Sequence, residues 1–334
     1  MPFFVAFHQK NAVFFVFFFN TDKRDLCKGV FMRCLFLLFL CFPMFAHSLT
    51  IATWNMQTFF DAETCGTEYR EFKGERWTRD AYERRVRSAS EALKKIGADV
   101  IVLEEVENEG VLFDLFNEYA AGFSAKKIWR YACFASEKGA SIGVAVISRF
   151  ALENVRTHCV DIRTNGAQSS VRPIVEVDVK AGKHTVTVFA NHWKSKLGGG
   201  ENIRRAQEQS LSFAFGRRIH SGGAAVACGD FNSDLAQFLR DESGEKIVLC
   251  GKTDCTSVFS AWDFARADGG SYAFKGKWER IDHIFFAGAV ELCAFKVFDE
   301  PPFIDQNGFP ARFSLFSNSG LSDHLPLFAA LDFL

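Results

Sequence analysis

The segment Ala224-Ala-Val-Ala-Cys-Gly-Asp-Phe-Asn232 contains the pattern on which the fold prediction depends. A short apolar run is followed, after one glycine, by an acid and an amide. Ala224–Cys228 has the length and composition of a buried strand. Asp230 and Asn232 follow in the turn, where a loop presents side chains on a rigid sheet. One such residue is more often a cap or a turn former than a catalytic group. The same pattern recurs, however, at Asn55, Glu105, His192, Asp282, Asp323 and His324. We therefore expect these side chains to share one cleft.

The chain from Leu49 onward alternates between strand-like and helix-like segments. An apolar stripe that includes Tyr82 and Leu93 predicts a helix over Thr78–Ile96, and a second helix is predicted over Asn202–His220. Strands are predicted at Leu49–Trp54, Asp99–Leu103, Ser141–Ser148, Val171–Val179, His184–Ala190, Ala224–Cys228, Ile281–Phe286 and Pro326–Phe333. No linker interrupts this order. We expect one domain over residues 49–334, with two β-sheets packed face to face and helices outside.

The first 48 residues have a different character. Met32-Arg33, the apolar run Leu35–Phe45 and Ala46-His47-Ser48 have the basic, apolar and small-residue parts of a signal peptide. The apolar run is too short for a membrane-spanning helix, which needs about 20 residues. We expect a signal peptide over residues 32–48 and export to the periplasm or the outside of the cell. Residues 1–31 are expected to be an untranslated or disordered extension. The alternative is an uncleaved N-terminal segment that anchors the protein to a membrane.

Composition and charge limit the kind of partner. Of the 334 residues, 48% are hydrophobic and 24% charged, which is globular composition. Residues 1–48 carry five basic and two acidic side chains, so 34 basic residues face 38 acidic ones in the remainder, a balance of −4. Proteins with a broad nucleic-acid footprint are usually basic. Any grip on nucleic acid must therefore be local and assisted by metal.

The cysteines give no sign of a metal site. Seven of them follow residue 48, and none has the spacing of zinc ligands. Cys250 and Cys255 are near enough in sequence to close a small disulfide loop in an oxidising compartment. Because seven is odd, at least one thiol is left free or pairs between chains. We expect structural roles for all of them.

Six motifs in order resemble those of the endonuclease/exonuclease/phosphatase superfamily, the group that includes DNase I-like and exonuclease III-like enzymes. They are Trp54-Asn55, Val102-Leu-Glu-Glu-Val-Glu-Asn108, Gly143–Ser148 with Arg172-Pro173, Asn191-His-Trp-Lys-Ser-Lys196, Gly229-Asp-Phe-Asn232, and Arg280-Ile-Asp-His283 with Ser322-Asp-His324. The likeness is greatest to the secreted bacterial nucleases. It implies a four-layer αββα sandwich of two mixed β-sheets. One departure is Glu104, where the family usually has Gln.

The resemblance also implies roles for the residues at the strand ends. Glu105 would bind the metal, with Asn55 and Asp323 completing or supporting the site, and Mg²⁺ is the expected ion because it prefers oxygen ligands. Mn²⁺ and Ca²⁺ are alternatives. Asp282 would orient the imidazole of His324. Asp230 and Asn232 would face the attacking water, while His192 would transfer a proton or bind phosphate. The protein is thus expected to be a metal-dependent phosphodiester hydrolase.

The substrate is less constrained than the chemistry. Arg172, Lys194, Lys196, Arg204 and Arg205 are candidate phosphate contacts, and the aromatic residues between cations in Tyr69–Trp77 resemble base-stacking sites. Trp77 and Tyr82 serve equally well as anchors of the first helix. We expect a monomer that binds nucleic acid, without stable membrane insertion, and that acts as an endonuclease. The alternatives are a sphingomyelinase-like or inositol-phosphate enzyme, whose membrane contacts would lie in Pro301–Ile304 or Phe309–Phe316, and a non-catalytic binding protein.

Overall fold

The computed structural model describes residues 3–9, 12–18, 49–64, 66–121, 128–160, 162–164, 167–168, 171–264 and 269–334. The strands of the described residues form two eight-stranded sheets and two small hairpins. The first has the order β1 (Phe3–Gln9), β2 (Ala12–Phe18), β5 (Tyr131–Glu137), β6 (Gly143–Ser148), β4 (Val100–Val106), β3 (Leu49–Phe59), β20 (Leu327–Phe333) and β19 (Val290–Val297). The second has the order β13 (Leu239–Arg240), β14 (Ile247–Leu249), β15 (Thr256–Ser260), β18 (Asp282–Ala287), β12 (Ala224–Asp230), β11 (His184–His192), β10 (Ile174–Ala181) and β7 (Ala151–His158).

Both large sheets are mixed. Strand β3 pairs with β4 in parallel and with β20 antiparallel, and β12 pairs with β11 in parallel and with β18 antiparallel. Two small hairpins lie outside the large sheets, β8 (Arg163–Thr164) with β9 (Ala167–Gln168) and β16 (Tyr272–Phe274) with β17 (Lys277–Glu279). Short 3₁₀ helices occupy Arg70–Lys73, Leu235–Gln237 and Ala261–Phe264.

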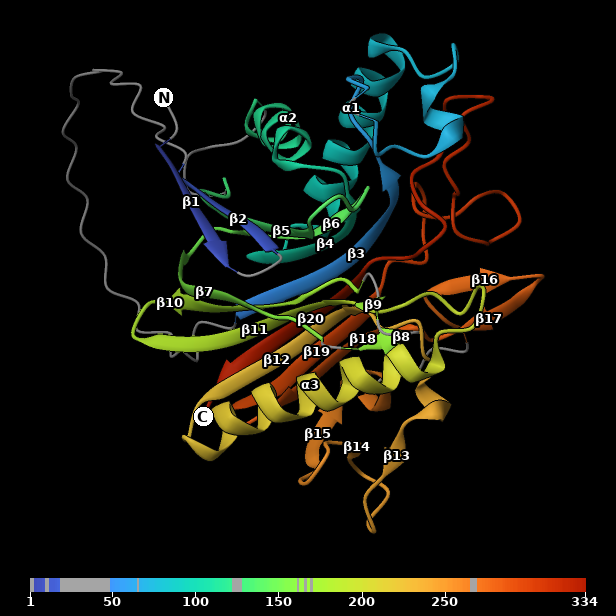
Figure 1. Cartoon of the computed structure of the whole chain (residues 1–334). Coiled ribbons are helices and arrows are strands. Elements are labelled where there is room, and N and C mark those ends of the chain that lie inside the picture. Colours follow the sequence, from blue (N-terminus) through green and yellow to red (C-terminus); the bar gives the residue numbers. More distant parts are fainter. Residues whose placement is uncertain are drawn as a thin grey trace, which may run out of the picture.

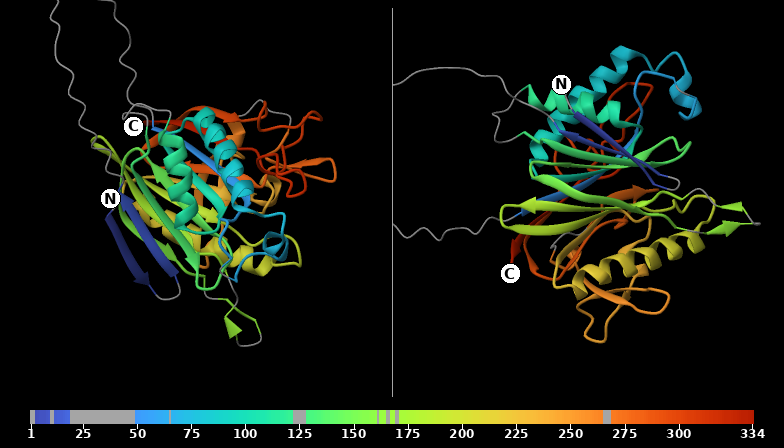
Figure 2. Two further views of the ribbon diagram at one scale, coloured as in Figure 1. Left: turned by 90° about the horizontal axis from the view of Figure 1, so that it is seen from above. Right: turned by 60° about the vertical axis from the view of Figure 1, so that its left-hand side comes forward.

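Helices cover the outer face of each sheet. Helices α1 (Arg79–Ile96) and α2 (Glu109–Ala120) lie on the first sheet, and α3 (Glu201–His220) lies on the second (Figure 1). The right-hand view of Figure 2 shows the resulting order of helix, sheet, sheet and helix. The expected αββα sandwich is confirmed.

The central strands are apolar on both faces because each is covered on both sides. In β4, Val100 and Val102 belong to the core between the sheets, whereas Ile101 and Leu103 pack toward α1 and α2. Side chains alternate across a strand, so a continuous apolar run is what a strand buried on both faces requires.

Helix α1 begins and ends where its sequence predicts. The Thr78 hydroxyl accepts a hydrogen bond from the backbone N–H of Ala81 at 3.2 Å, which caps the helix. Gly97 ends it with a left-handed φ of 65°. Tyr82 and Leu93 are buried as expected, and Arg85, between them on the same stripe, is also buried.

The N-terminal region differs from the expectation in part. Residues 1–31 were expected to hold no folded element, yet β1 and β2 form a hairpin, and β2 pairs antiparallel with β5 at the edge of the first sheet. The predicted signal peptide over residues 32–48 lies outside the described residues. Its removal, the start site and the boundary at Leu49 stay predictions. Of the described helices, none is long and apolar enough to cross a membrane.

Several elements were not predicted. Strands β7 and β19 are mostly half-buried or exposed, and β14, β16 and β17 have only three residues each, so their sequences carry little signal. Strands β5 and β15 were missed as well. Cys250 and Cys255 are not joined by a disulfide in the structure, and Cys65 lies outside the described residues.

Candidate active site

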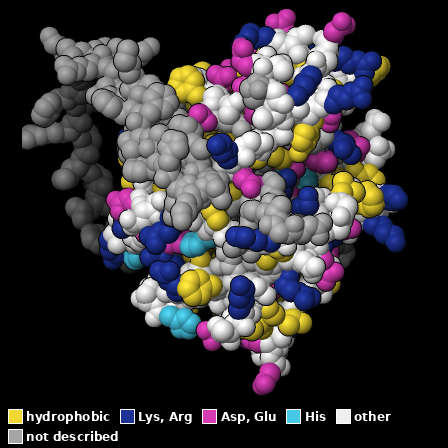
Figure 3. All heavy atoms as spheres, viewed as in Figure 1, with side chains coloured by type: hydrophobic (Ala, Val, Ile, Leu, Met, Phe, Trp, Pro, Cys, Tyr) yellow, Lys and Arg dark blue, Asp and Glu magenta, His cyan; other side chains and the backbone are white. Residues whose placement is uncertain are grey.

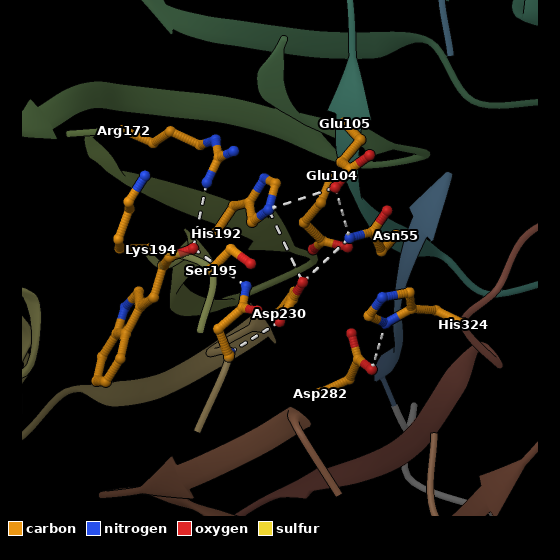
Figure 4. A network of polar contacts seen from close by, with 12 residues as sticks. Asn55, Glu104, Glu105, Arg172, His192, Lys194, Ser195, Asp230, Asp282 and His324 are labelled. Atoms are coloured by element: carbon orange, nitrogen blue, oxygen red, sulfur yellow. Dashed lines mark hydrogen bonds and ion pairs between the residues drawn. The ribbon is translucent and has the colours of Figure 1, made fainter. Parts of the chain in front are cut away.

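Strand register brings the predicted residues together. Along the second sheet, His192 is the direct partner of Asp230 on the neighbouring strand, and Asp230 is in turn the partner of Asp282. Asn55 on β3 is paired with Glu104 on β4 in the opposing sheet. Figure 4 shows that side chains from both sheets converge on one place. The strand ends therefore bring Asn55, His192, Asp230 and Asp282 close together, and their roles stay predictions.

Asp282 and His324 form a buried pair. Nδ1 of His324 lies 2.8 Å from Oδ2 of Asp282, and the two residues are only 7% and 1% exposed. Burial alone would lower the pKa of His324, but the charge of Asp282 and its hydrogen bond raise it well above the ordinary value. The imidazole is therefore held as a cation. With Nδ1 engaged by Asp282, its Nε2 is the nitrogen that can meet a substrate oxygen.

Asp230 lies between the two sheets and is held on both oxygens. Its Oδ2 accepts from Nδ2 of Asn55 at 3.1 Å, and its Oδ1 accepts from the backbone N–H of Asn232 at 2.8 Å. Burial and the neighbouring carboxylate of Asp282 raise the pKa of Asp230 to about 7. A carboxyl group with that pKa can accept a proton near neutral pH.

The turn that carries Asp230 depends on the residue before it. Gly229 has a φ of 140°, and a Cβ there would lie 1.9 Å from the carbonyl oxygen of Asn191. Only glycine fits this approach between β12 and β11. This explains physically why the segment from residue 229 to 232 begins with glycine.

Glu105 ends β4 in a strained backbone conformation, with a φ of 61°. Its carboxylate accepts from the backbone N–H of Thr58 at 2.6 Å and from Nδ2 of Asn55 at 3.3 Å. The side chain is 20% exposed, which is more than its neighbours Asp230 and His192. Glu105 is thus a fixed carboxylate that solvent can reach.

His192 lies on the other side of Asp230. Its Nε2 is 3.7 Å from Glu105 and 3.8 Å from Asp230, and its Nδ1 has no hydrogen-bond partner. Burial, with the positive charges of Arg172 and His324, lowers its pKa well below the ordinary value. The two approaches are therefore contacts of a neutral imidazole, not ion pairs.

Glu104, the departure from the family pattern, is buried beneath the site. Its Oε1 accepts from the hydroxyl of Thr53 at 2.7 Å, while Oε2 has no partner. Burial raises the pKa of Glu104 well above the ordinary value, and Asp282 and Asp230 add to the rise. A protonated carboxylic acid has nearly the shape of a Gln side chain and no charge. Glu104 in this form therefore fits where the family usually has Gln.

Asp323 and Asn55 are the two other residues predicted to bind or support the metal. Asp323 is 20% exposed at the site, 3.8 Å from Nη2 of Arg312. Asn55 turns its Oδ1 to the backbone N–H of Gln57 at 2.9 Å. With its amide nitrogen on Glu105 and Asp230, Asn55 holds these carboxylates together and does not turn an oxygen toward them. Its role as a metal ligand stays a prediction.

Only two of the five candidate phosphate contacts lie beside the centre. Arg172 and Lys194 extend to the same side of His192 (Figure 4). Lys196 forms an ion pair with Glu279 at 2.7 Å. Arg204 donates to the carbonyls of Lys194, Ser195 and Gly199. Arg205 is 3.7 Å from Glu201, one turn before it on the helix. The last three hold loops and helix in place.

The aromatic loop mostly packs inward. Trp77 meets Phe72, Tyr82 and Phe313 edge to face, and Tyr82 is buried with its hydroxyl on Asp114. Both residues anchor α1. Tyr69 is different, since it is 38% exposed and lies next to Arg172.

The sequence matches one family model. The model of the Endonuclease/Exonuclease/phosphatase family covers residues 52–324, from the first core strand to His324. The chain belongs to this family. Its members are hydrolases that act on phosphoester bonds and depend on divalent metal. No curated protein sequence matches the chain.

Solved structures agree with the family assignment at the level of the fold. Truncated TDP2 of Caenorhabditis elegans has a TM-score of 0.55 and 15% identity over 86% of this chain and 98% of its own. The catalytic domain of human nocturnin has a TM-score of 0.53 and 15% identity, over 86% and 95%. A mannosyl-6-phosphatase of Bacteroides thetaiotaomicron has a TM-score of 0.54 and 16% identity, over 86% and 100%.

The residues of the site fit the family's divalent metal. Asp230, Asp282 and His324 have polar atoms within 4.8 Å of one another, and of these the two carboxylates would supply the oxygen ligands, because Asp282 holds His324 as a cation. Oδ1 of Asp282 is buried without a hydrogen-bond partner, and Glu105 adds a carboxylate that solvent can reach. An oxygen-rich set with excess negative charge suits a hard cation.

Arg85 is a residue of the site that the sequence analysis missed. Its guanidinium is buried and donates to the carbonyls of Met56, Gln57 and Thr58. Burial lowers its pKa to about 9, against the charges of Glu105 and Asp323. Gln57 and Thr58 both have positive φ, and Arg85 holds this strained loop so that the N–H of Thr58 meets Glu105. The available signal was a cation on the apolar stripe of α1.

Proposed function

We propose that this member of the family is an exported nuclease that hydrolyses phosphodiester bonds of DNA or RNA by metal-assisted attack of water. The observation that carries the choice of substrate is the position of Arg172 and Lys194 beside His192. Across the described part of the chain, neither cation has a carboxylate within ion-pair distance. Two cations without anionic partners next to a phosphoester-hydrolysing centre favour a substrate with several phosphates.

Mg²⁺ is the proposed ion, held by Glu105 with support from Asp323, and when bound it would act as a Lewis acid on a phosphate oxygen. The chain's own groups do the rest. Asp230, with a pKa of about 7, is suited to orient water and take its proton. Asn232 would hold the same water from the neighbouring turn.

The Asp282–His324 pair is proposed to stabilise the phosphoryl group. Its imidazolium would donate from Nε2 to a phosphate oxygen on which negative charge develops, or protonate the leaving oxygen. His192 is neutral, because its pKa is lowered well below the ordinary value, so it would contact the phosphate through a hydrogen bond and not through charge.

The charge pattern of the surface agrees with a local grip. On the face in Figure 3, Lys and Arg side chains are interspersed with Asp and Glu and form no broad basic field. The stretches considered for membrane contact present no continuous exposed apolar surface: Phe303 and Phe313 are buried, whereas Pro301 and Pro302 are exposed and Phe316 is 82% exposed. These features favour a nuclease over a lipid phosphodiesterase.

Export is proposed from the segment 32–48, and Mn²⁺ or Ca²⁺ are the alternative ions. N-terminal sequencing of the exported protein should find a start near Leu49. Retention of residues 1–31 in the exported protein would overturn the signal-peptide interpretation.

A panel of substrates tests the activity. Purified protein is incubated with DNA, RNA, sphingomyelin and inositol phosphates, each with Mg²⁺ and with EDTA. The proposal expects cleavage of nucleic acid that EDTA abolishes. Cleavage of sphingomyelin or inositol phosphates alone would overturn it, and so would nucleic-acid cleavage unaffected by EDTA.

A further inference from the structure

A cavity of about 270 Å³ opens beside the catalytic centre. Arg172, Lys194 and Tyr69 line it together with the 137–142 turn, and Gln207 lies at its base. Arg172 and Lys194, which line the cavity, lie on the same side of His192 (Figure 4). The cavity therefore adjoins the site, and the carboxylates that would bind metal are not among its lining residues.

The two cations are fixed in place by a buried amide. Gln207 on α3 is 1% exposed, its Oε1 accepts from the backbone N–H of Lys194 at 2.9 Å, and its Nε2 donates to the carbonyl of Arg172 at 3.5 Å. One side chain thus ties together the two segments that carry the cations.

The aliphatic part of the Lys194 side chain packs against Gly200. A Cβ on Gly200 would lie 2.6 Å from Cγ of Lys194, and Gly200 has a φ of 90°. Arg204 fixes the rest of the loop through the carbonyls of Lys194, Ser195 and Gly199. Lys194 is consequently placed by the fold and is not a loose surface lysine.

The lining is suited to more than an anion. Glu137 faces the same cavity as the cations, and the exposed ring of Tyr69 packs edge-on against Phe60 with 5.4 Å between the centroids. A ligand that matches this surface has a phosphate for Arg172 and Lys194 and a flat or sugar ring for Tyr69. At about 270 Å³ the cavity is slightly smaller than the roughly 300–1,000 Å³ of drug-sized sites, so it admits a single nucleotide unit.

We propose that this cavity is a subsite for the nucleotide next to the scissile bond, with its phosphate on Arg172 and Lys194 and its nucleoside against Tyr69. The naming of a nucleotide rests on the proposed nuclease function. The subsite would make the enzyme favour substrates that carry a phosphate beyond the one being hydrolysed.

Binding of a small probe tests the subsite without turnover. The full chain is titrated in EDTA with thymidine 3′,5′-bisphosphate, thymidine and inorganic phosphate, and affinity is measured by calorimetry. EDTA removes divalent metal, so the probe cannot bind through a metal ion, and the variants described below assign the binding to the cavity. Because hydrogen bonds to charged groups are strong, the bisphosphate should bind about 10- to 100-fold more tightly than thymidine.

Variants assign that binding to the cavity. Lys194→Met should weaken bisphosphate binding about tenfold or more, and Tyr69→Phe, which keeps the ring, should weaken it less. Lys183→Met is the matched control, since Lys183 is exposed in the β10–β11 turn at the far end of β11 from His192. Its affinity should equal that of the unaltered protein. Circular dichroism checks that each variant is folded.

The outcomes separate this inference from the proposed function. Equal binding of thymidine and the bisphosphate, no effect of Lys194→Met, or equal binding of inorganic phosphate and the bisphosphate would each overturn the nucleotide subsite. Cleavage of nucleic acid with Mg²⁺ would still support the nuclease function if the subsite were overturned. Conversely, tight bisphosphate binding that depends on Lys194, without cleavage of nucleic acid, would support a nucleotide-binding cavity beside the site and reject the nuclease.

Discussion

His324 and His192 lie on either side of Asp230 and have opposite electrostatic character (Figure 4). His324 is bonded to Asp282 at 2.8 Å, and its pKa is raised well above the ordinary value. His192 is equally buried but meets carboxylates only at 3.7 and 3.8 Å, and its pKa is lowered well below the ordinary value. One site therefore holds a cationic and a neutral imidazole at the same pH.

The difference shows that direct contact with a carboxylate, which brings both its negative charge and a hydrogen bond, keeps a buried histidine charged, whereas approaches of 3.7 and 3.8 Å do not. Both rings lose the solvation of water, which disfavours the cation. Only the ring that receives a direct carboxylate contact recovers the loss. The two histidines should consequently respond to mutation and to pH in opposite ways.

The largest effect is expected at the charged histidine. His324→Ala should lower the turnover number about 10²- to 10⁴-fold, because it removes a group that donates to the reacting phosphate. Added Mg²⁺ or Mn²⁺ should not restore the loss, since the metal-binding carboxylates remain. Steady-state rates over a range of metal concentration test this, and recovery of activity by metal would refute the assignment.

The side of the site that holds His192 should be sensitive to metal instead. Glu105→Gln keeps the shape of the side chain but removes the charge near His192, so metal should bind more weakly. Activity at low Mg²⁺ should fall roughly 10- to 100-fold and recover in part at high Mg²⁺, as metal-site substitutions do. Titration of Mn²⁺ by calorimetry measures the affinity directly. Unchanged metal affinity would contradict the role of Glu105.

Stability should change with pH in opposite directions at the two rings. His192 has a lowered folded pKa, so the unfolded chain binds more protons and stability falls as pH drops below 6.5. His324 has a raised folded pKa, so its stabilisation is present below 6.5 and is lost as pH rises through the folded value. Each contributes a slope of up to about 1.4 kcal/mol per pH unit.

Difference curves isolate each ring. Urea unfolding of the metal-free protein is compared with His192→Gln below pH 6.5 and with His324→Gln above it. In His192→Gln the free energy of unfolding should fall less as the pH is lowered. In His324→Gln it should fall less as the pH is raised. If the difference in unfolding free energy changed with pH in the same direction for both variants, the opposite charge states of the two histidines would be refuted.

The smallest effect is expected beneath the pair, at Glu104. Its folded pKa is raised, so stability that is present below the unfolded value of about 4.5 is lost as pH rises. Glu104→Gln should therefore stabilise the metal-free protein at pH 7, by about 1 kcal/mol or more, and should have little effect at pH 4. Thermal unfolding at the two pH values measures this. Destabilisation at pH 7 would show that Glu104 is ionised.

Sequence patterns predicted the part of the site that lies at strand ends. Asp230 and Asp282 follow or begin apolar runs, and strand register then makes them neighbours without further information. The pairing of Asp282 with His324 came from the family resemblance, and the structure contains it. The fold class was predicted for the same reason, since apolar runs and hairpin turns determine the layers.

What the sequence could not supply are contacts made by side chains from distant helices. Arg85 lies on the apolar stripe of α1, which indicates burial but not the partners of the side chain, and Gln207 belongs to a charged helical segment. The packing of α1 and α3 shows what the two side chains contact. Arg204 and Lys196 looked like phosphate ligands because a sequence gives the charge of a residue but not its partner. The edge hairpin β1–β2 was missed because residues 1–31 precede the predicted signal peptide and were therefore expected to be an untranslated or disordered extension.

The carbonyl oxygen of Trp193 accepts two hydrogen bonds, from Nη1 of Arg172 at 3.2 Å and from Nδ2 of Asn232 at 3.1 Å. The cavity and the catalytic turn therefore share one acceptor. Free energies of groups that share a partner do not add. A phosphate that draws Arg172 off this oxygen leaves the whole acceptor to Asn232, so occupation of the cavity and the precision of the catalytic turn are thermodynamically linked.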